Sequence, residues 1–248
     1  QLEVRKKLEQ DVELLNAKLE KDQLERLNIQ YERDLVELKL ASLRSQMNPH
    51  FIFNSLNSIK GFIIDNEQEN AVFYLNKFSK LIRMILSSSM EKDISLADEI
   101  EIAKLYVNVE NIRFNNEIKF ILEVDKTLPL STIKIPALLF QPFLENAIWH
   151  GLAAKEGEKE LHFSIEKKGQ QLLVIIKDNG IGREKSAAIK NKKLLKRDSY
   201  GMKLTEDRLK SFVSFNNNSY ELEIEDLKDE ENTALGTRVK ISLPIFFN

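Results

Sequence analysis

The first 38 residues repeat one pattern, in which an apolar residue recurs every three to five positions among charged ones. Neither Gly nor Pro interrupts this stretch. The spacing predicts one long amphipathic helix from Val4 to Leu38. A single apolar stripe of this length needs a partner to cover it, most simply the same helix of a second copy in a coiled coil. A lone solvated helix is the alternative, and the sustained spacing favours the coiled coil.

The helical pattern continues to about Ile64, breaks at the following Asp-Asn pair and resumes over residues 71–86. Two helices of an antiparallel hairpin are the predicted result. Ser95, followed closely by two acidic residues, resembles a helix start, and the next helix is expected to run to about Phe114.

Beyond Phe114 short apolar runs and turn residues replace the helical pattern. The expected elements are a strand at 120–124, a helix from Pro136 to His150, a hairpin at 162–178 with its turn at 167–170, a helix at 203–215, and closing strands at 220–225 and 237–243. This order predicts an α+β sandwich with helices on one face of a mixed sheet. We therefore expect a coiled-coil helix at 1–41, a helical hairpin at 42–115 and the sandwich at 116–248.

Composition narrows the class of protein. Hydrophobic residues make up 42% of the chain and charged residues 31%, a balance typical of a soluble globular protein. The formal net charge of −2 gives no overall field that favours nucleic acid, so no nucleic-acid partner is expected. The absence of cysteine excludes disulfides, a thiolate nucleophile and a Cys-based zinc site, and it suits the cytoplasm.

No apolar run approaches the roughly 18 residues of a spanning helix, and the start does not resemble a secretory signal. Because the chain opens with Gln inside a predicted helix, we expect a fragment of a longer protein. Its upstream part could include a membrane anchor.

His50 is one of only three histidines and lies in the stretch QMNPHFIFNSLN. Pro49 within a helix costs roughly 3 kcal/mol, which predicts a useful kink beside His50. Asn54 follows four residues later, so it lies on the same helix face. Histidine is partly neutral near pH 7, as a nitrogen nucleophile must be. An ordinary surface histidine in a kinked helix explains these residues equally well.

Two further segments carry polar groups suited to a nucleotide. DNGIG follows an apolar strand, so Asp178 could accept a hydrogen bond from an exocyclic amine while Gly180 and Gly182 let the backbone approach a flat ligand. An ordinary Asp-Asn-Gly turn is the alternative. QPFLENAIWHG places Glu145 beside Asn146, and such oxygen ligands suit Mg²⁺. The polar face of an amphipathic helix would look the same.

In their order along the chain, these segments resemble the histidine kinases of the LytS/YehU type, whose catalytic half is a Bergerat-type domain of the GHKL ATPase superfamily. The resemblance covers about residues 42–243. It rests on QMNPHFIFNSLN, QPFLENAIWHG, DNGIG, SYGMKLTEDRL and GTRVKISLP.

The resemblance implies a fold, a reaction and a set of functional residues. Mg-ATP is the implied cofactor, and a neutral nitrogen of His50 is the implied phosphoacceptor. Asn146 is implied to hold Mg²⁺ and Asp178 to recognise adenine, beneath a mobile lid at 183–200. The other implied residues are Asn54 and Glu145, with catalytic roles, and His150, Gly180, Gly182, Gly201 and Thr237, which contribute to nucleotide binding.

Two positions depart from the patterns of similar kinases. Ser199 replaces the first glycine of the usual Gly-x-Gly at the lid, so Gly201 is the safer assignment. Phe51 follows the phosphoacceptor where many histidine kinases carry an acidic residue, as expected for the LytS type. Another group must therefore orient the imidazole, and Glu145 is the candidate.

The resulting hypothesis is a sensor histidine kinase of a two-component system, the cytoplasmic domain of an inner-membrane protein. It would act as a homodimer and pass its phosphoryl group to an aspartate of a response regulator, for which the LytTR type is the candidate. One alternative is a degenerate kinase that serves as a dimeric scaffold. The other is a hydrolytic GHKL ATPase, which is disfavoured because Pro142 stands where such enzymes carry the glutamate that activates water.

Overall fold

The computed structural model describes residues 49–192, 199–214 and 219–247, and the isolated positions 18, 21, 25, 26, 29 and 30. The contacts divide the chain into two compact units, Gln1–Pro49 and His50–Asn248. The isolated positions of the first unit are all helical and exposed. The rest of the predicted coiled coil and the chain that precedes the predicted kink at Pro49 lie outside the described residues.

The helical hairpin is present as predicted. Helices α2 (Pro49–Ile64) and α3 (Gln68–Ser88) flank a turn in which Asn66 adopts a left-handed conformation, with φ 59°. Phe62 lies 6.0 Å from Tyr74, measured between ring centroids, near the turn. Phe51 lies 5.8 Å from Phe78, farther along both helices, so the two helices run antiparallel.

Helix α4 (Leu96–Arg113) begins as the sequence indicates. Ser95 ends the short strand β1 (Asp93–Ser95), and its Oγ accepts a hydrogen bond from the Asp98 backbone N–H at 3.0 Å. The helix packs against α3 and also against α5 and β3 of the sandwich. Most of its length is therefore buried on more than one side, and its buried residues include Glu99 and Glu110.

A five-stranded mixed sheet forms the sandwich, in the order β2-β4-β5-β7-β6. Strand β2 pairs with β4 in parallel, and the remaining neighbours are antiparallel. The strands are β2 (Ile118–Val124), β4 (Lys159–Lys168), β5 (Gln171–Asp178), β6 (Glu221–Lys228) and β7 (Ala234–Pro244). The predicted hairpin and closing strands are confirmed.

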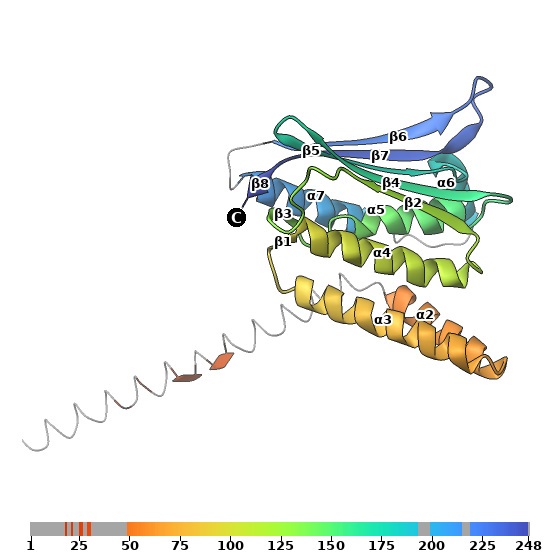
Figure 1. The fold of residues 1–248 in the computed structure, drawn as a ribbon, viewed down its shortest axis with the longest axis horizontal. Helices are drawn as coiled ribbons and strands as arrows, with labels where there is room; N and C mark the ends of the chain where they lie inside the picture. The colour runs from red at the N-terminus through yellow and green to blue at the C-terminus, as the bar shows by residue number, and fades with distance from the viewer. Residues whose placement is uncertain are drawn as a thin grey trace, which may run out of the picture. The chain divides into compact units, whose positions relative to one another are not determined.

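The helices α4 to α7 lie together below one face of this sheet (Figure 1). The inner face supplies buried apolar rows such as Phe163, Ile176 and Val239, which are aligned across β4, β5 and β7. The outer face carries ion pairs instead, including Arg238–Glu225 at 2.6 Å. The predicted α+β sandwich with helices on one face is confirmed. Helices α6 (Arg183–Lys192) and α7 (Ser199–Ser214) follow β5 along the chain.

One predicted element is wrong at its start. Residues 133–136 form strand β3 (Ile133–Pro136) of a second, three-stranded sheet, completed by β1 and β8 (Phe246–Phe247). The helix begins only at α5 (Gln141–Glu145) and continues as the π-helix η1 (Asn146–Leu152). Leu138, with φ 56°, cannot belong to a right-handed helix. The apolar run at 137–140 is wholly buried, so it has no polar face from which a period could be recognised.

Within the described part of the chain, no helix combines the length and apolar character needed to cross a bilayer.

Candidate functional site

Asp178 is the last residue of β5 and lies on the inner face of the sheet. Its side chain continues the buried row of Leu172, Val174 and Ile176, and the residue is only 4% exposed. The Gly180 backbone N–H donates to Asp178 Oδ1 at 2.8 Å. The chain turn after the strand therefore fixes the carboxylate from one side.

Three glycines around Asp178 lie so close to neighbouring atoms that no side chain fits at their positions. A Cβ on Gly151 would lie 2.6 Å from Asp178 Oδ1. A Cβ on Gly180 would lie 2.3 Å from the Gly151 carbonyl carbon, and one on Gly236, where φ is 130°, would lie 2.0 Å from the Asp178 backbone oxygen. The Ile181 N–H also donates to the Gly151 carbonyl at 3.0 Å. The segments QPFLENAIWHG, DNGIG and GTRVKISLP thus meet at Asp178.

Burial raises the pKa of Asp178 to about 6, although backbone N–H groups, that of Gly180 first, act in the opposite direction. A buried carboxyl held this way keeps acceptor capacity for one further donor. An exocyclic amine of a flat base is a donor of the right kind. The residues therefore fit the adenine of a nucleotide, and the glycines let the segments that hold Asp178 pack closely.

The other predicted binding residues of the sandwich lie close in the fold. Thr237 is paired with Asp178 across β5 and β7, and Gly182, the last residue of DNGIG, adopts φ 75°. Helix η1 packs on the inner face against β4, β5 and β7, and it contains Asn146 and His150. Both residues are half-buried. Helices of π geometry are rare and are often found at functional sites.

Glu145 and Asn146 offer carboxylate and amide oxygens at the junction of α5 and η1. Among the described residues, no group of three or more His, Cys, Asp and Glu side chains could hold a metal ion. Mg²⁺ needs no such cage, because it usually takes one or two protein oxygens and completes its shell with waters and phosphates. The donor set therefore fits Mg²⁺ bound together with a nucleotide.

The remaining predicted site residues belong to other elements. His50 and Asn54 lie in α2 of the hairpin, and Gly201 lies in α7. Helix α6 occupies the first half of the predicted lid, and residues 193–198 are outside the described part of the chain. The structure thus places the predicted phosphoacceptor and the predicted nucleotide residues on separate elements of one unit.

A cluster on α4, which we call the α4 cluster, was not expected from the sequence. It consists of Tyr106, Glu110 and Arg113 together with Trp149 of η1. Arg113 Nη1 lies 2.7 Å from Glu110 Oε2, and the guanidinium carbon lies 4.5 Å from the centre of the Trp149 ring. Burial raises the pKa of Glu110 to about 7, against the lowering effects of the Arg113 charge and of a hydrogen bond from Trp149.

A second buried acid, Glu99, stabilises the turn before α5. Its carboxylate accepts hydrogen bonds from the Leu138 and Phe140 backbone N–H groups, both at 2.9 Å. Burial raises its pKa to about 7 despite these hydrogen bonds. The burial of both acids could have been predicted from the sequence. Glu99, Ala103, Tyr106 and Glu110 follow one another at spacings of three or four residues, so all four share one buried helix face.

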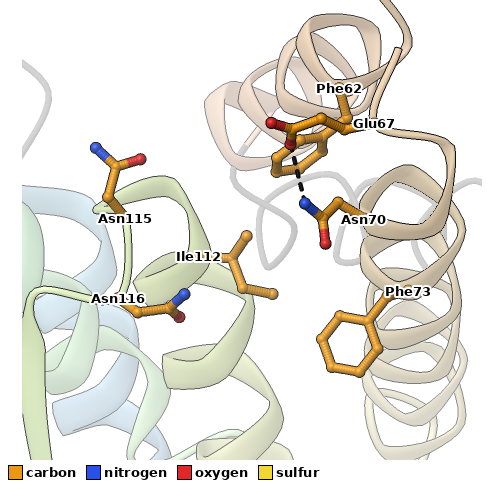
Figure 2. Close-up of a pocket in the computed structure, with 7 residues that line it drawn as sticks. All are labelled: Phe62, Glu67, Asn70, Phe73, Ile112, Asn115 and Asn116. Carbon is orange, nitrogen blue, oxygen red and sulfur yellow. Dashed lines mark hydrogen bonds between the residues drawn. The ribbon is translucent and has the colours of Figure 1, made fainter. Parts of the chain in front are cut away.

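A pocket of about 360 Å³ lies away from these motifs, where the tip of the hairpin faces the end of α4 (Figure 2). The hairpin contributes Phe62, Glu67, Asn70 and Phe73, and the other wall is made by Ile112, Asn115 and Asn116. None of the predicted site residues lines it. The pocket therefore lies where α3 and α4 are no longer in close contact, at the hairpin tip.

Comparison with known proteins gives an independent indication of the family. Residues 38–118 match the family model described as "Histidine kinase". The chain is 36% identical over 155 residues to the sensor histidine kinase BtsS of Escherichia coli (strain K12), an alignment that covers 60% of this chain and 27% of BtsS. It is 30% identical over 148 residues to the sensor protein LytS of Enterococcus faecalis, covering 60% of this chain and 25% of LytS.

The chain thus spans about a quarter of the length of these relatives. Among solved structures, it is similar to the histidine kinase domain of the blue-light activated histidine kinase from Erythrobacter litoralis EL346. The TM-score is 0.43 at 17% identity, over 86% of this chain and 93% of the other.

Proposed function

Because the chain belongs to the LytS type of sensor histidine kinases, we propose that it transfers the γ-phosphoryl group of Mg-ATP to His50. The observation that carries the proposal is the convergence of three glycines on a buried Asp178, directly beside the helix that holds Asn146. His50 lies on a separate helical hairpin, as an acceptor brought to a bound nucleotide requires.

Each group of residues would have one role in the reaction. Asp178 would accept the hydrogen bond of the adenine amine, and the glycines around it would let the ring lie against the backbone. Asn146 would hold Mg²⁺, which neutralises phosphate charge when bound. His150, Gly182, Gly201 and Thr237 would complete the walls of the nucleotide site.

His50 would act as the nucleophile from its neutral form, and the main task of the protein is to bring it in line with the phosphate. Glu145, next to Asn146, is our candidate for orienting the imidazole. Asn54, one turn after His50, would orient a water molecule in the reverse, dephosphorylating reaction.

A homodimer is the proposed assembly, and the exposed apolar side chains of the hairpin support it. Phe53 is 66% exposed and Leu56 51% exposed on α2, while Val72 is 58% exposed on α3. Large apolar side chains gathered on one hairpin mark an interaction surface, and a second hairpin of the same kind would cover it. A response regulator would then take the phosphoryl group, and the resemblance makes the LytTR class the candidate. We further propose that the chain is the cytoplasmic part of a membrane-bound sensor.

Labelling with γ-labelled ATP and Mg²⁺ tests the function. We expect an acid-labile, base-stable phosphate, which His50→Gln abolishes while leaving nucleotide affinity nearly unchanged. His162→Gln is the matched control, because this exposed histidine lies on the outer face of the sheet. Retained labelling in His50→Gln would exclude His50 as the acceptor. Nucleotide binding without any labelling in the unmodified protein would favour the dimeric scaffold instead.

A further inference from the structure

The α4 cluster lies between the two parts that the proposed reaction must bring together. Helix α4 packs against α3 of the hairpin on one side and against α5 of the sandwich on the other. Tyr106 and Glu110 are almost completely buried, and Arg113 is 13% exposed. A side chain that shifts at this position must displace its neighbours, because buried packing leaves little free space.

On the hairpin side, the cluster contacts the residue that directly follows His50. Phe51 is 6% exposed, and its ring centroid lies 5.5 Å from that of Tyr106. A displacement of the start of α2 would therefore act on Tyr106 through this ring contact, as it would on Phe78 of α3. Glu110 follows Tyr106 by one helical turn on the same face of α4.

On the sandwich side, the cluster fixes Trp149. The Arg113 guanidinium stacks over the indole at 4.5 Å from the ring centre, and the Phe114 ring lies 5.5 Å from it on the same end of α4. A planar guanidinium held by a carboxylate restricts both the tilt and the position of the ring it covers. Trp149 comes three residues after Asn146 in the same π-helix, so a displacement of the helix at Trp149 also moves Asn146.

Stability alone does not explain the choice of residues. Glu110 is 0% exposed, and its Oε1 has no hydrogen-bond partner among the described residues. A buried carboxylate paired through only one oxygen contributes less to stability than a well-packed apolar side chain of similar volume. The ion pair with Glu110 does, however, fix the orientation of the Arg113 guanidinium over the Trp149 ring.

The pocket of Figure 2 shows that α3 and α4 are not packed along their whole length. Phe73 and Ile112 face this space from opposite walls, and Ile112 directly precedes Arg113. The hairpin and α4 are therefore closely packed around Tyr106 and less closely packed at the end that holds the pocket.

We propose that the α4 cluster positions helix η1 for phosphoryl transfer and adjusts it to the position of α2. Its members are positioning residues, and they act through Asn146 and not on the substrate directly. The inference rests on the proposed function, since it names how the nucleotide site and the phosphoacceptor helix are coupled.

Three variants of the full chain separate positioning from mere stability. Arg113→Ala removes the stack and the ion pair, and at saturating Mg-ATP it should lower the labelling rate by about 10-fold or more. Arg113→Lys keeps a charge near Glu110 but not the planar stack, so it should recover thermal stability without recovering the rate. Lys104→Met removes a positive charge from the exposed side of the same helix and should leave both unchanged. The proposal would be overturned if Arg113→Lys recovered the labelling rate together with the thermal stability. A normal labelling rate in Arg113→Ala would overturn it as well.

A double-mutant cycle tests the coupling without relying on catalysis. Phe51→Leu should change the affinity for Mg-ADP by about 3-fold in the otherwise unmodified chain, and by clearly less when Arg113 is already Ala. Trp149 is the sole tryptophan, so its emission reports binding at the cluster directly, and calorimetry gives the affinity independently. Independent effects of the two substitutions would refute the coupling. If the two substitutions have non-additive effects on Mg-ADP affinity but the unmodified chain is not labelled, the proposed reaction is refuted and the coupling is not. If the unmodified chain does not bind nucleotide, both are refuted.

Discussion

Replacement of Gly151 by Ala offers a sharp test of the nucleotide site, because the added methyl group would point at Asp178. Its carbon would lie 2.6 Å from Oδ1 and 2.9 Å from Cγ, whereas ordinary contacts begin near 3.4 Å. The carboxyl group must therefore move by about 0.8 Å, the difference between 3.4 and 2.6 Å. Overpacking of this kind costs roughly 1–3 kcal/mol, of which up to about 1 kcal/mol is offset by the better helix propensity of Ala.

The larger effect should be on binding. A displaced carboxylate would lose the hydrogen bond that we propose it makes to the base, and such a bond to a charged group contributes about 1.5–3 kcal/mol, or roughly 10- to 150-fold in affinity. Calorimetric titration with ATP measures this loss, and urea unfolding measures the stability. We expect Gly151→Ala to fold but to bind ATP weakly.

Two other glycines provide the comparison. A Cβ on Gly180 would meet the backbone of Gly151 at 2.3 Å, and because backbone cannot move aside as a side chain can, Gly180→Ala should cost more stability than Gly151→Ala. Gly61 in α2 has no atom within 4 Å of such a Cβ, so Gly61→Ala should stabilise the chain by up to about 1 kcal/mol and leave affinity unchanged. Normal ATP affinity in Gly151→Ala would refute the assignment of Asp178.

Three further expectations follow from the structure. Asp178→Asn should weaken nucleotide binding with or without Mg²⁺, whereas Asn146→Asp should chiefly change the Mg²⁺ dependence, and identical titration profiles would contradict both roles. Glu99 ionises less readily in the folded chain than in the unfolded one, because folding raises its pKa from 4.5 to about 7. The free energy of unfolding should therefore be highest below pH 4.5 and fall by about 3 kcal/mol as the pH rises through 7. Urea unfolding at pH 5 and pH 8 should show a smaller fall in Glu99→Gln than in the unmodified chain, and an equal fall in both proteins would disprove this expectation. Leu56→Glu should weaken the dimer in analytical ultracentrifugation, while Leu235→Glu, with the same 51% exposure on β7, should not; an undiminished dimer in Leu56→Glu would place the interface elsewhere.

Much of the fold followed from local pattern. The hairpin, the capped start of α4 and the strands β4 to β7 were predictable, because each has a regular period or a recognisable turn or cap. The small sheet of β1, β3 and β8 was not, since strands of two to four residues are too short to display alternation. Helix α6 was also missed, because its residues form the charged first half of the expected lid.

The candidate site was predictable only in part. Asp178 follows an apolar strand, so its burial could be inferred from the sequence. Gly151 and Gly236 stood in the quoted motifs, but only the tertiary contact shows that both approach Asp178. The pairing of Glu110 with Arg113 is local, at a spacing of three residues, yet the ring above it comes from Trp149 in a distant segment. The roles assigned to these residues in binding and transfer stay predictions.

The π geometry of η1 has a consequence for how the chain can vary in length. Over seven residues, N–H groups pair with carbonyl groups five positions back instead of four, so the segment contains more chain than an α-helix between the same ends. Loss of one residue inside Asn146–Leu152 could be absorbed by a return to α-helical pairing, with α5 and β4 left where they are. The same loss in α4, which is α-helical throughout and has no extra residue to give up, would rotate the rest of that helix by about 100°. A single-residue deletion in η1 should therefore leave the fold intact while displacing Asn146, Trp149 or Gly151 and weakening nucleotide binding, whereas the same deletion in α4 should disrupt the fold itself.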